Sequence, residues 1–226
     1  MKRWAGMAKA FTRIGREIAI AVREGGPDPD YNPRLRLAIQ NAKAANMPKA
    51  NVENAIKKAS EKDAANYDEV VYEGYGPHGI AVVVETATDN TTRTVANVRH
   101  AFSKYGGSLG TNGSVDYMFE RVGQFKADPE GLDLDELELA LIDHGLEEIR
   151  RDEDGKVIFQ SGFSDFGSLS AALEDKGVAV ESSELVRLPQ HTKALSDEQA
   201  EEVIRLIDKL EDEDDVVNVF HTMDES

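Results

Sequence analysis

The sequence contains no cysteine among its 226 residues. That absence excludes disulfide bonds, cysteine-ligated zinc, iron–sulfur clusters and thiol catalysis in one step. Long apolar runs are also missing, since none reaches the roughly 18 residues that a membrane-spanning helix needs. The residues after Met1 lack the apolar core of a secretory signal peptide. From these absences we expect a cytoplasmic protein that does not contact membranes.

Positive charge is scarce in the chain as a whole. Lysine and arginine number 26 against 43 aspartate and glutamate residues, which gives a formal net charge of −17 at pH 7. The scarcity is uneven, because residues 1–62 hold 13 basic and six acidic residues and the rest of the chain is strongly acidic. Such asymmetry is typical of a basic binding segment joined to an acidic body. Screening over about 8–10 Å means that a phosphate at the basic segment would respond mainly to that segment.

Helical patterns dominate the basic segment. Apolar residues recur at three- and four-residue spacing from Trp4 onward, which predicts an amphipathic helix that the glycine pair at 25–26 should end. Asn32, followed by a proline, is a start signal for a second helix. A third helix is expected over residues 48–60. The sequence therefore predicts a helical basic domain at residues 1–62.

Strand patterns replace helical ones after residue 67. Two β-rich runs at residues 70–72 and 80–84 predict a hairpin. A helix follows over about residues 91–105, and residues 115–119 are predicted to form a strand. These elements begin an α+β domain.

Residues 122–188 have the predicted order β-α-β-β-α-β, which is that of a ferredoxin-like domain. A helix capped at Ser196 and a strand at 216–220 follow, and this pair cannot bury a core alone. We expect them to complete the earlier α+β domain. The predicted fold class is α+β multidomain: an N-terminal three-helix domain (1–62) plus two α+β domains, one at 63–121 plus 189–226 and the other, ferredoxin-like and inserted into it, at 122–188.

A basic stripe is expected on the first helix. Lys9, Arg13 and Arg16 lie on the side opposite the apolar residues. Phosphate contacts from such side chains supply most non-specific affinity for nucleic acid. The alternative is an ordinary solvated face whose cations pair locally with Glu17 and Glu24. The candidate nucleic-acid-binding residues of the helical domain are Lys9, Arg13, Arg16, Arg34, Arg36, Lys43, Lys49, Lys57 and Lys58. If the stripe faces solvent, Arg13→Glu with Arg16→Glu should leave folding intact and abolish binding.

A second basic cluster adds Arg93, Arg99 and Lys104 to the candidates. It precedes a glycine-rich stretch at residues 106–113, whose backbone N–H groups could hold a phosphate. The alternative, which the composition favours, is a flexible connection between a helix and a strand.

Other motifs do not indicate catalysis or a cofactor. Residues 74–79 match G-x-G-x-x-G, but a strand rather than a helix follows and Pro77 removes an N–H donor, so a hairpin turn is predicted. The five histidines lack metal-ligand spacing, and no serine lies in a nucleophile elbow. The acidic run at 211–215 is expected to be a solvated helix end, with weak cation binding as the alternative. We therefore expect no enzyme activity, no metal, no cofactor and no small-molecule substrate.

Several longer segments resemble the YebC/PmpR family. They are EGGPDP at 24–29, NPRLRLAI at 32–39, AKAANMP at 42–48, YEGYGPHGIA at 72–81, RTVANVR at 93–99, FSK at 102–104 and GGSLG at 106–110. The resemblance implies a helical domain plus two α+β domains, one ferredoxin-like and inserted in the other. It implies no cofactor and no catalytic residue. One departure is a short N-terminal arm, since only Met1-Lys2-Arg3 precede Trp4.

Two functions follow from the resemblance. Members are described as probable DNA-binding transcriptional regulators of the bacterial cytoplasm, whereas mitochondrial relatives are translational activators and a ribosome-associated role has been proposed for bacterial members. The first function implies duplex DNA as the partner, and the second implies ribosomal RNA or the ribosome. No helix with obvious base-reading side chains is visible, so weak sequence specificity is expected in either case. The sequence leaves the choice and the oligomeric state open.

Overall fold

The computed structural model describes residues 2–225, with side chains from residue 7 onward. Its basic segment folds into three helices, α1 (Lys2–Gly25), α2 (Pro33–Ala44) and α3 (Lys49–Ala59). Ile18, Leu35 and Val52 form part of their shared core. Asn32 begins α2 as predicted: its side-chain oxygen accepts a hydrogen bond from the Leu35 amide at 3.1 Å. The first three helices were thus predictable from spacing and capping signals.

The first sheet has the strand order β3-β1-β2-β8 and is antiparallel throughout. Its strands are β1 (Asp68–Tyr75), β2 (Ala81–Thr88), β3 (Ser108–Leu109) and β8 (Val216–His221). Helices α4 (Thr91–Lys104) and α7 (Asp197–Glu211) pack on one face, where Phe102 and Leu206 are fully buried against β2. A short 3-10 turn, η1 (Pro77–Gly79), connects β1 to β2, as the predicted hairpin requires.

The second sheet has the strand order β5-β6-β4-β7. Its elements along the chain are β4 (Phe119–Ala127), α5 (Leu134–Leu141), η3 (Ile142–His144), β5 (Leu146–Arg151), β6 (Val157–Gly162), η4 (Phe163–Asp165), α6 (Phe166–Asp175) and β7 (Val180–Pro189). This order of strands and helices is ferredoxin-like. Phe125 and Phe159 are buried beneath α5 and α6. The predicted fold class is confirmed, while the exact domain boundaries stay a prediction.

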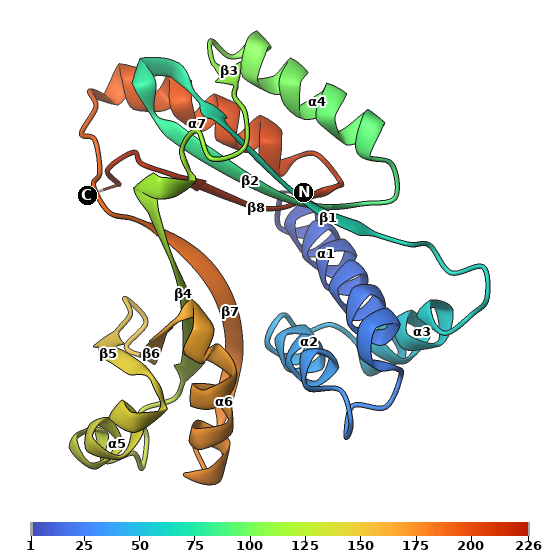
Figure 1. The fold of residues 1–226 in the computed structure, drawn as a ribbon, viewed down its shortest axis with the longest axis vertical. Coiled ribbons are helices and arrows are strands. Elements are labelled where there is room, and N and C mark those ends of the chain that lie inside the picture. The colour runs from blue at the N-terminus through green and yellow to red at the C-terminus, as the bar shows by residue number, and fades with distance from the viewer. Residues whose placement is uncertain (1, 226) are drawn as a thin grey trace.

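Two long strands connect the sheets. β4 and β7 pair from Phe119 with Pro189 to Ala127 with Val180, and they run from the first sheet to the second (Figure 1). The predicted strand at 115–119 is wrong, because residues 116–118 form the 3-10 turn η2 (Asp116–Met118) and β4 begins at Phe119. The amides of Val115 and Asp116 donate to the Glu73 carboxylate instead of to a neighbouring strand.

The helical domain contacts both sheets. α1 runs from the edge of the first sheet to α2 and α3 (Figure 1). α2 packs against β7, where the Asn41 side chain donates to the Ser183 carbonyl at 2.8 Å and accepts from the Ser183 amide at 2.9 Å. Within residues 2–225, no helix combines the length and apolar character needed to cross a membrane.

Candidate nucleic-acid interface

The basic stripe on α1 faces the turn between α7 and β8. Lys9 forms an ion pair with Asp212. Arg13 donates to the backbone carbonyls of Glu211 and Val216, both at 3.1 Å. The predicted solvent-facing stripe is therefore wrong: these side chains hold α1 against the first sheet, because the acidic turn lies where solvent was expected.

Arg16 enters a buried polar cluster around Asp215. Its guanidinium donates to the Asp215 carboxylate at 2.8 Å and to the Ala87 carbonyl at 2.6 Å. The exposed fractions of the two side chains are 14% for Arg16 and 7% for Asp215, so water is largely excluded from the pair. The guanidinium also lies over the Tyr67 ring, 5.3 Å from its centroid. A phosphate could reach Arg16 only after this cluster opens.

Two residues of α4 complete the Asp215 cluster. Arg93 donates to the carboxylate at 2.9 Å and Thr94 at 2.7 Å. Burial alone would raise the pKa of Asp215, but hydrogen bonds from Arg93, Thr94 and Arg16 outweigh burial and lower this pKa below its ordinary value. Arg93 also pairs with Asp89 at 2.9 Å. One carboxylate thus connects α1, α4 and the turn before β8.

Arg34 is surrounded by carboxylates from two further elements. It pairs with Glu17 at 2.8 Å and with Glu24 at 2.9 Å, both on α1, and with Glu69 on β1 at 2.8 Å. Burial would lower the pKa of Arg34, but hydrogen bonds to these carboxylates raise it. The local pairing that was the alternative to phosphate binding is therefore present at Arg34.

Other candidates on α2 and α3 remain exposed. Lys43, Lys57 and Lys58 are exposed, and in the part of the chain that the structure describes none forms an ion pair. Lys49 lies 3.6 Å from Glu53, with exposed fractions of 89% and 64%, so the pair contributes little. Arg36 donates to two carbonyls, those of Pro29 and Asp30, and is otherwise exposed. We call these five cations, Arg36, Lys43, Lys49, Lys57 and Lys58, the α2–α3 basic surface.

The α4 cations form a separate cluster. Arg99 and Lys104 are exposed, and Lys104 lies 5.5 Å from the centroid of the Tyr105 ring. α4 covers the first sheet near the beginning of α1, while α2 and α3 pack near its end (Figure 1). A helix of 24 residues is about 36 Å long. The two exposed clusters therefore lie near opposite ends of α1.

Several backbone amides of the glycine-rich stretch already donate within the chain. Glu73, whose exposed fraction is 6%, accepts hydrogen bonds from the amides of Gly113, Val115 and Asp116 at 2.7–2.8 Å. Burial would raise the pKa of Glu73, but these three amides outweigh burial and lower it. The Gly110 amide donates to the Glu73 carbonyl. The stretch connects a helix to a strand, as its composition favoured, but β3 and the hydrogen bonds to Glu73 give it a defined structure instead of the expected flexible one.

Sequence reasoning missed the acidic side of these contacts. Residues 211–215 were expected to be a solvated helix end or a weak cation site. Among the described residues no group of three or more histidine, aspartate or glutamate side chains could hold a metal ion. Glu211, Asp212 and Asp214 are exposed, as expected of a solvated helix end. Asp212 and the buried Asp215 also supply partners to α1 and α4. No sequence signal indicates this, because Arg16 and Asp215 are 199 residues apart.

Two models of one protein family match most of this chain. A family model of the TACO1/YebC N-terminal domain matches residues 1–62, and a model of the TACO1/YebC second and third domains matches residues 67–223. The chain belongs to the TACO1/YebC family. The predicted resemblance to this family is confirmed over nearly the whole length.

Relatives in the TACO1/YebC family are similar from end to end. A probable transcriptional regulatory protein of Flavobacterium johnsoniae is 56% identical over 225 residues, covering 100% of this chain and 94% of the relative. One of Porphyromonas gingivalis is 53% identical, with coverage of 100% and 93%. A crystal structure of a conserved hypothetical protein from Aquifex aeolicus has a TM-score of 0.81 at 40% identity, covering 96% of this chain and 90% of that one.

Proposed function

We propose that this TACO1/YebC chain is a non-enzymatic regulator of gene expression that binds nucleic acid through the α2–α3 basic surface. Its relatives are named as probable transcriptional regulatory proteins, which supports a regulatory role. The observation that carries the choice of surface is the exposure of Lys43, Lys57 and Lys58 without carboxylate partners among the described residues. Unpaired ammonium groups can displace the counterions condensed on nucleic-acid phosphates without first breaking an ion pair of the protein.

The other candidates divide into two groups. Arg99 and Lys104 supply a second, smaller contact on α4. Lys9, Arg13, Arg16, Arg34 and Arg93 position the helices instead of binding phosphate, since carboxylates or backbone carbonyls of the chain already accept their hydrogen bonds. Recruiting them to nucleic acid would break internal pairs without a matching gain.

Duplex DNA in promoters is the first candidate target, in line with the names of the relatives. Structured RNA is the second. The outward side of α3 carries lysines and Glu53, and only two amide side chains there, Asn51 and Asn54, could read base edges, so its contacts are mainly with phosphates. Recognition by phosphate position and overall shape serves folded RNA as well as duplex DNA. We expect weak dependence on base sequence in both cases.

The test compares matched single charge reversals. Lys57→Glu on α3 is set against Lys176→Glu, an exposed lysine just beyond α6. Binding is measured by fluorescence anisotropy on promoter duplex, random duplex and an RNA hairpin between 50 and 200 mM salt. Each lost phosphate contact should reduce the slope of log affinity against log salt by about 0.9 on duplex DNA. Lys57→Glu should show this loss and Lys176→Glu should not.

Two results would reject the proposal: no binding of any of the three nucleic acids at 50 mM salt, or equal effects of the two substitutions. Sedimentation of cell extracts after DNase then separates the targets. Co-migration with ribosomes that persists after DNase, and that Lys57→Glu weakens, identifies the RNA target. Loss of co-migration with retained promoter binding identifies DNA.

A further inference from the structure

The outer side of α5 presents apolar side chains to solvent. Leu139 is 77% exposed and Ile142, in the adjoining η3 turn, is 54% exposed. Residues three apart lie side by side on a helical surface, so the two form one apolar strip. The helix cannot rotate to bury them, because Leu137 and Leu141 are already committed to the core of the ferredoxin-like domain. The strip therefore stays exposed unless another molecule covers it.

Uncompensated carboxylates border the strip. Asp135 and Asp143 lie four residues before and after Leu139, and Glu138 lies four residues before Ile142. Among the described residues these three carboxylates form no ion pair. Elsewhere in the same domain lysines pair with acidic groups: Lys126 with Asp152 at 2.6 Å, and Lys156 with Asp128 at 2.8 Å and Glu181 at 2.6 Å. The three carboxylates that border the strip on α5 have no such cationic partner.

The C-terminal part of α5 is electrostatically unfavourable. α5 has no basic residue in its last turn, where a cation would interact well with the helix dipole. Like charges three or four residues apart repel one another by a few tenths of a kcal/mol per pair. Cations from another molecule would relieve both costs. The strip and its acidic border together therefore indicate a positively charged partner.

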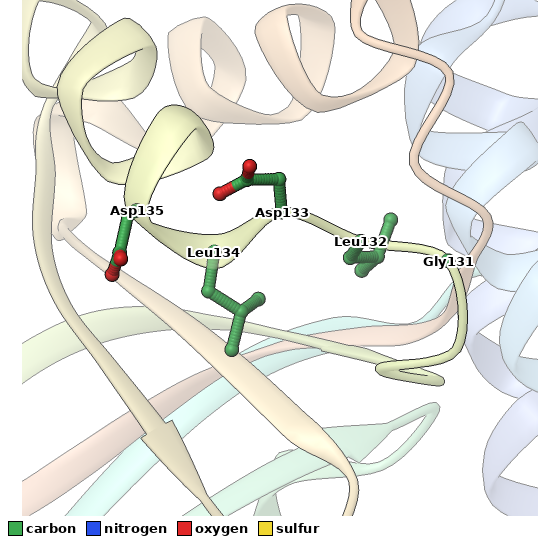
Figure 2. A pocket seen from close by; sticks show the side chains of 5 residues that line it. All are labelled: Gly131, Leu132, Asp133, Leu134 and Asp135. Atoms are coloured by element: carbon green, nitrogen blue, oxygen red, sulfur yellow. The ribbon is translucent and has the colours of Figure 1, made fainter.

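A shallow hollow continues this surface. Its volume is about 500 Å³, and Asp135 lines it together with residues 131–134 (Figure 2). Asp133 is occupied, since its carboxylate accepts from the Glu136 amide at 3.1 Å and caps α5. The Asp135 carboxylate has no such role. A lysine or arginine side chain lying in the hollow would meet this carboxylate at the edge of the apolar strip.

We propose that this α5 face, formed by Asp135, Glu138, Leu139, Ile142 and Asp143, docks a lysine- and arginine-rich amphipathic helix of a partner protein. Its leucine-sized side chains would cover the strip, and its cations would meet the bordering carboxylates. Nucleic acid is a poor occupant, because residues 122–188 hold 17 acidic and only six basic residues. α5 lies apart from α2 and α3, across the second sheet (Figure 1). Protein docking and nucleic-acid binding therefore use separate surfaces.

Photocrosslinking of the full-length chain in cells tests this surface. The photoreactive amino acid p-benzoylphenylalanine replaces Leu139, and in a matched control it replaces Ile204, which is 43% exposed on α7. Crosslinked peptides are identified by mass spectrometry after nuclease treatment. A second chain combines the probe at 139 with Asp135→Asn, Glu138→Gln and Asp143→Asn. Thermal unfolding of all chains checks that the exposed substitutions leave the fold intact.

The expected result is a crosslinked segment at position 139 that is net basic, has apolar residues at helical spacing and is absent at position 204. Its yield should fall several-fold in the neutralised chain and in 500 mM salt compared with 50 mM. A crosslink to a neutral or acidic segment, to a second copy of this chain, or one unchanged by charge neutralisation would overturn the proposal. So would an absence of crosslinks beyond those of position 204. None of these outcomes depends on nucleic-acid binding, which is measured separately.

Discussion

At the scale of single residues, two buried carboxylates organise the first sheet and its surroundings. Asp215 receives hydrogen bonds from α1 and α4, and Glu73 receives three from one loop. A buried carboxylate is tolerated only when its lone pairs are satisfied, and removing one side of such a pair strands the other. Both residues therefore matter more for stability than any exposed lysine of the molecule.

Asp215→Asn should destabilise the protein strongly. The substitution leaves Arg16 and Arg93 without the anion that they share, and a broken buried pair typically costs about 3–5 kcal/mol. Urea denaturation at pH 7 measures the free energy of unfolding. The matched control is Asp212→Asn, whose side chain is 61% exposed in its pair with Lys9 and should change that free energy by about 1 kcal/mol or less. Equal effects of the two substitutions would contradict the assignment.

Acid should weaken the wild-type fold through the same groups. The pKa of Asp215 in the folded protein lies below its ordinary value of 3.8, and the pKa of Glu73 lies below 4.5. Their contribution to stability is therefore fully present above those ordinary values and is lost as pH falls through the lower, folded values. Urea denaturation at steps from pH 6 to pH 2.5 should show this decline. Asp215→Asn should show a shallower decline, and an unchanged one would contradict the linkage.

Glu73→Gln should loosen the connection between α4 and β4. A neutral amide accepts weaker hydrogen bonds from the amides of Gly113, Val115 and Asp116, and its NH₂ group faces one of these donors. Hydrogen exchange at these three amides should accelerate at least tenfold. The control Glu120→Gln, at an exposed position on β4, should leave their exchange unchanged. Unaltered exchange in Glu73→Gln would mean that other contacts hold the loop.

At the scale of elements, α1 connects the helical domain to the first sheet. Its apolar side packs with α2 and α3, and its basic side forms hydrogen bonds with the turn after α7. The amphipathic pattern predicted the helix and its inner side correctly. It could not predict that the opposite side is also covered, because a charged helix face has the same spacing whether it meets water or a distant acidic turn.

Arg13→Glu with Arg16→Glu should now destabilise the protein, which reverses the expectation from the sequence. Two glutamates would face Asp215 and the carbonyls of Glu211 and Val216, so attraction becomes repulsion. We expect a fall in the melting temperature of at least several degrees. Lys57→Glu with Lys58→Glu changes the formal charge equally on an exposed face and should leave the melting temperature within about a degree or two. Equal melting temperatures of the two double variants would support the original prediction that Arg13 and Arg16 face solvent.

Features set by residues close together in the sequence were predicted correctly, and features set by distant residues were not. Caps such as Asn32 and Ser196 act within four residues, and each begins its helix as the sequence indicates. The ferredoxin-like order was predictable because hydrophobic spacing sets every element in it. The strand expected at 115–119 failed, because Glu73, some 40 residues away, takes the amides. Contacts of that kind leave no periodic pattern.

At the scale of the whole molecule, polar contacts join the helical part to the ferredoxin-like part. Gln40 and Asn41 of α2 bond to the backbone of β7, which is an edge strand of the second sheet. The Asn41 amide pairs with Ser183 as a neighbouring strand would, so it also covers part of an open sheet edge. The relative placement of the helical and ferredoxin-like parts depends on these bonds.

Asn41→Ala should loosen that placement without unfolding either part. The substitution removes both hydrogen bonds to Ser183 while Ala38 and Ala42 keep the α2 core intact. Small-angle X-ray scattering should show a larger radius of gyration, and circular dichroism should be unchanged. Asn54→Ala on the exposed side of α3 serves as the control. A radius of gyration equal to that of the wild type would show that apolar contacts alone fix the arrangement.

The hydrogen bonds between α1 and the turn before β8 have a consequence for synthesis of the chain. Arg13 and Arg16 leave the translation machinery about 200 residues ahead of the turn that satisfies them. Until residues 211–216 are made, the guanidinium groups of Arg13 and Arg16 lack these partners. A turn that is made late therefore covers the basic side of a helix that is made early, and a chain truncated before that turn leaves Arg13 and Arg16 without these partners.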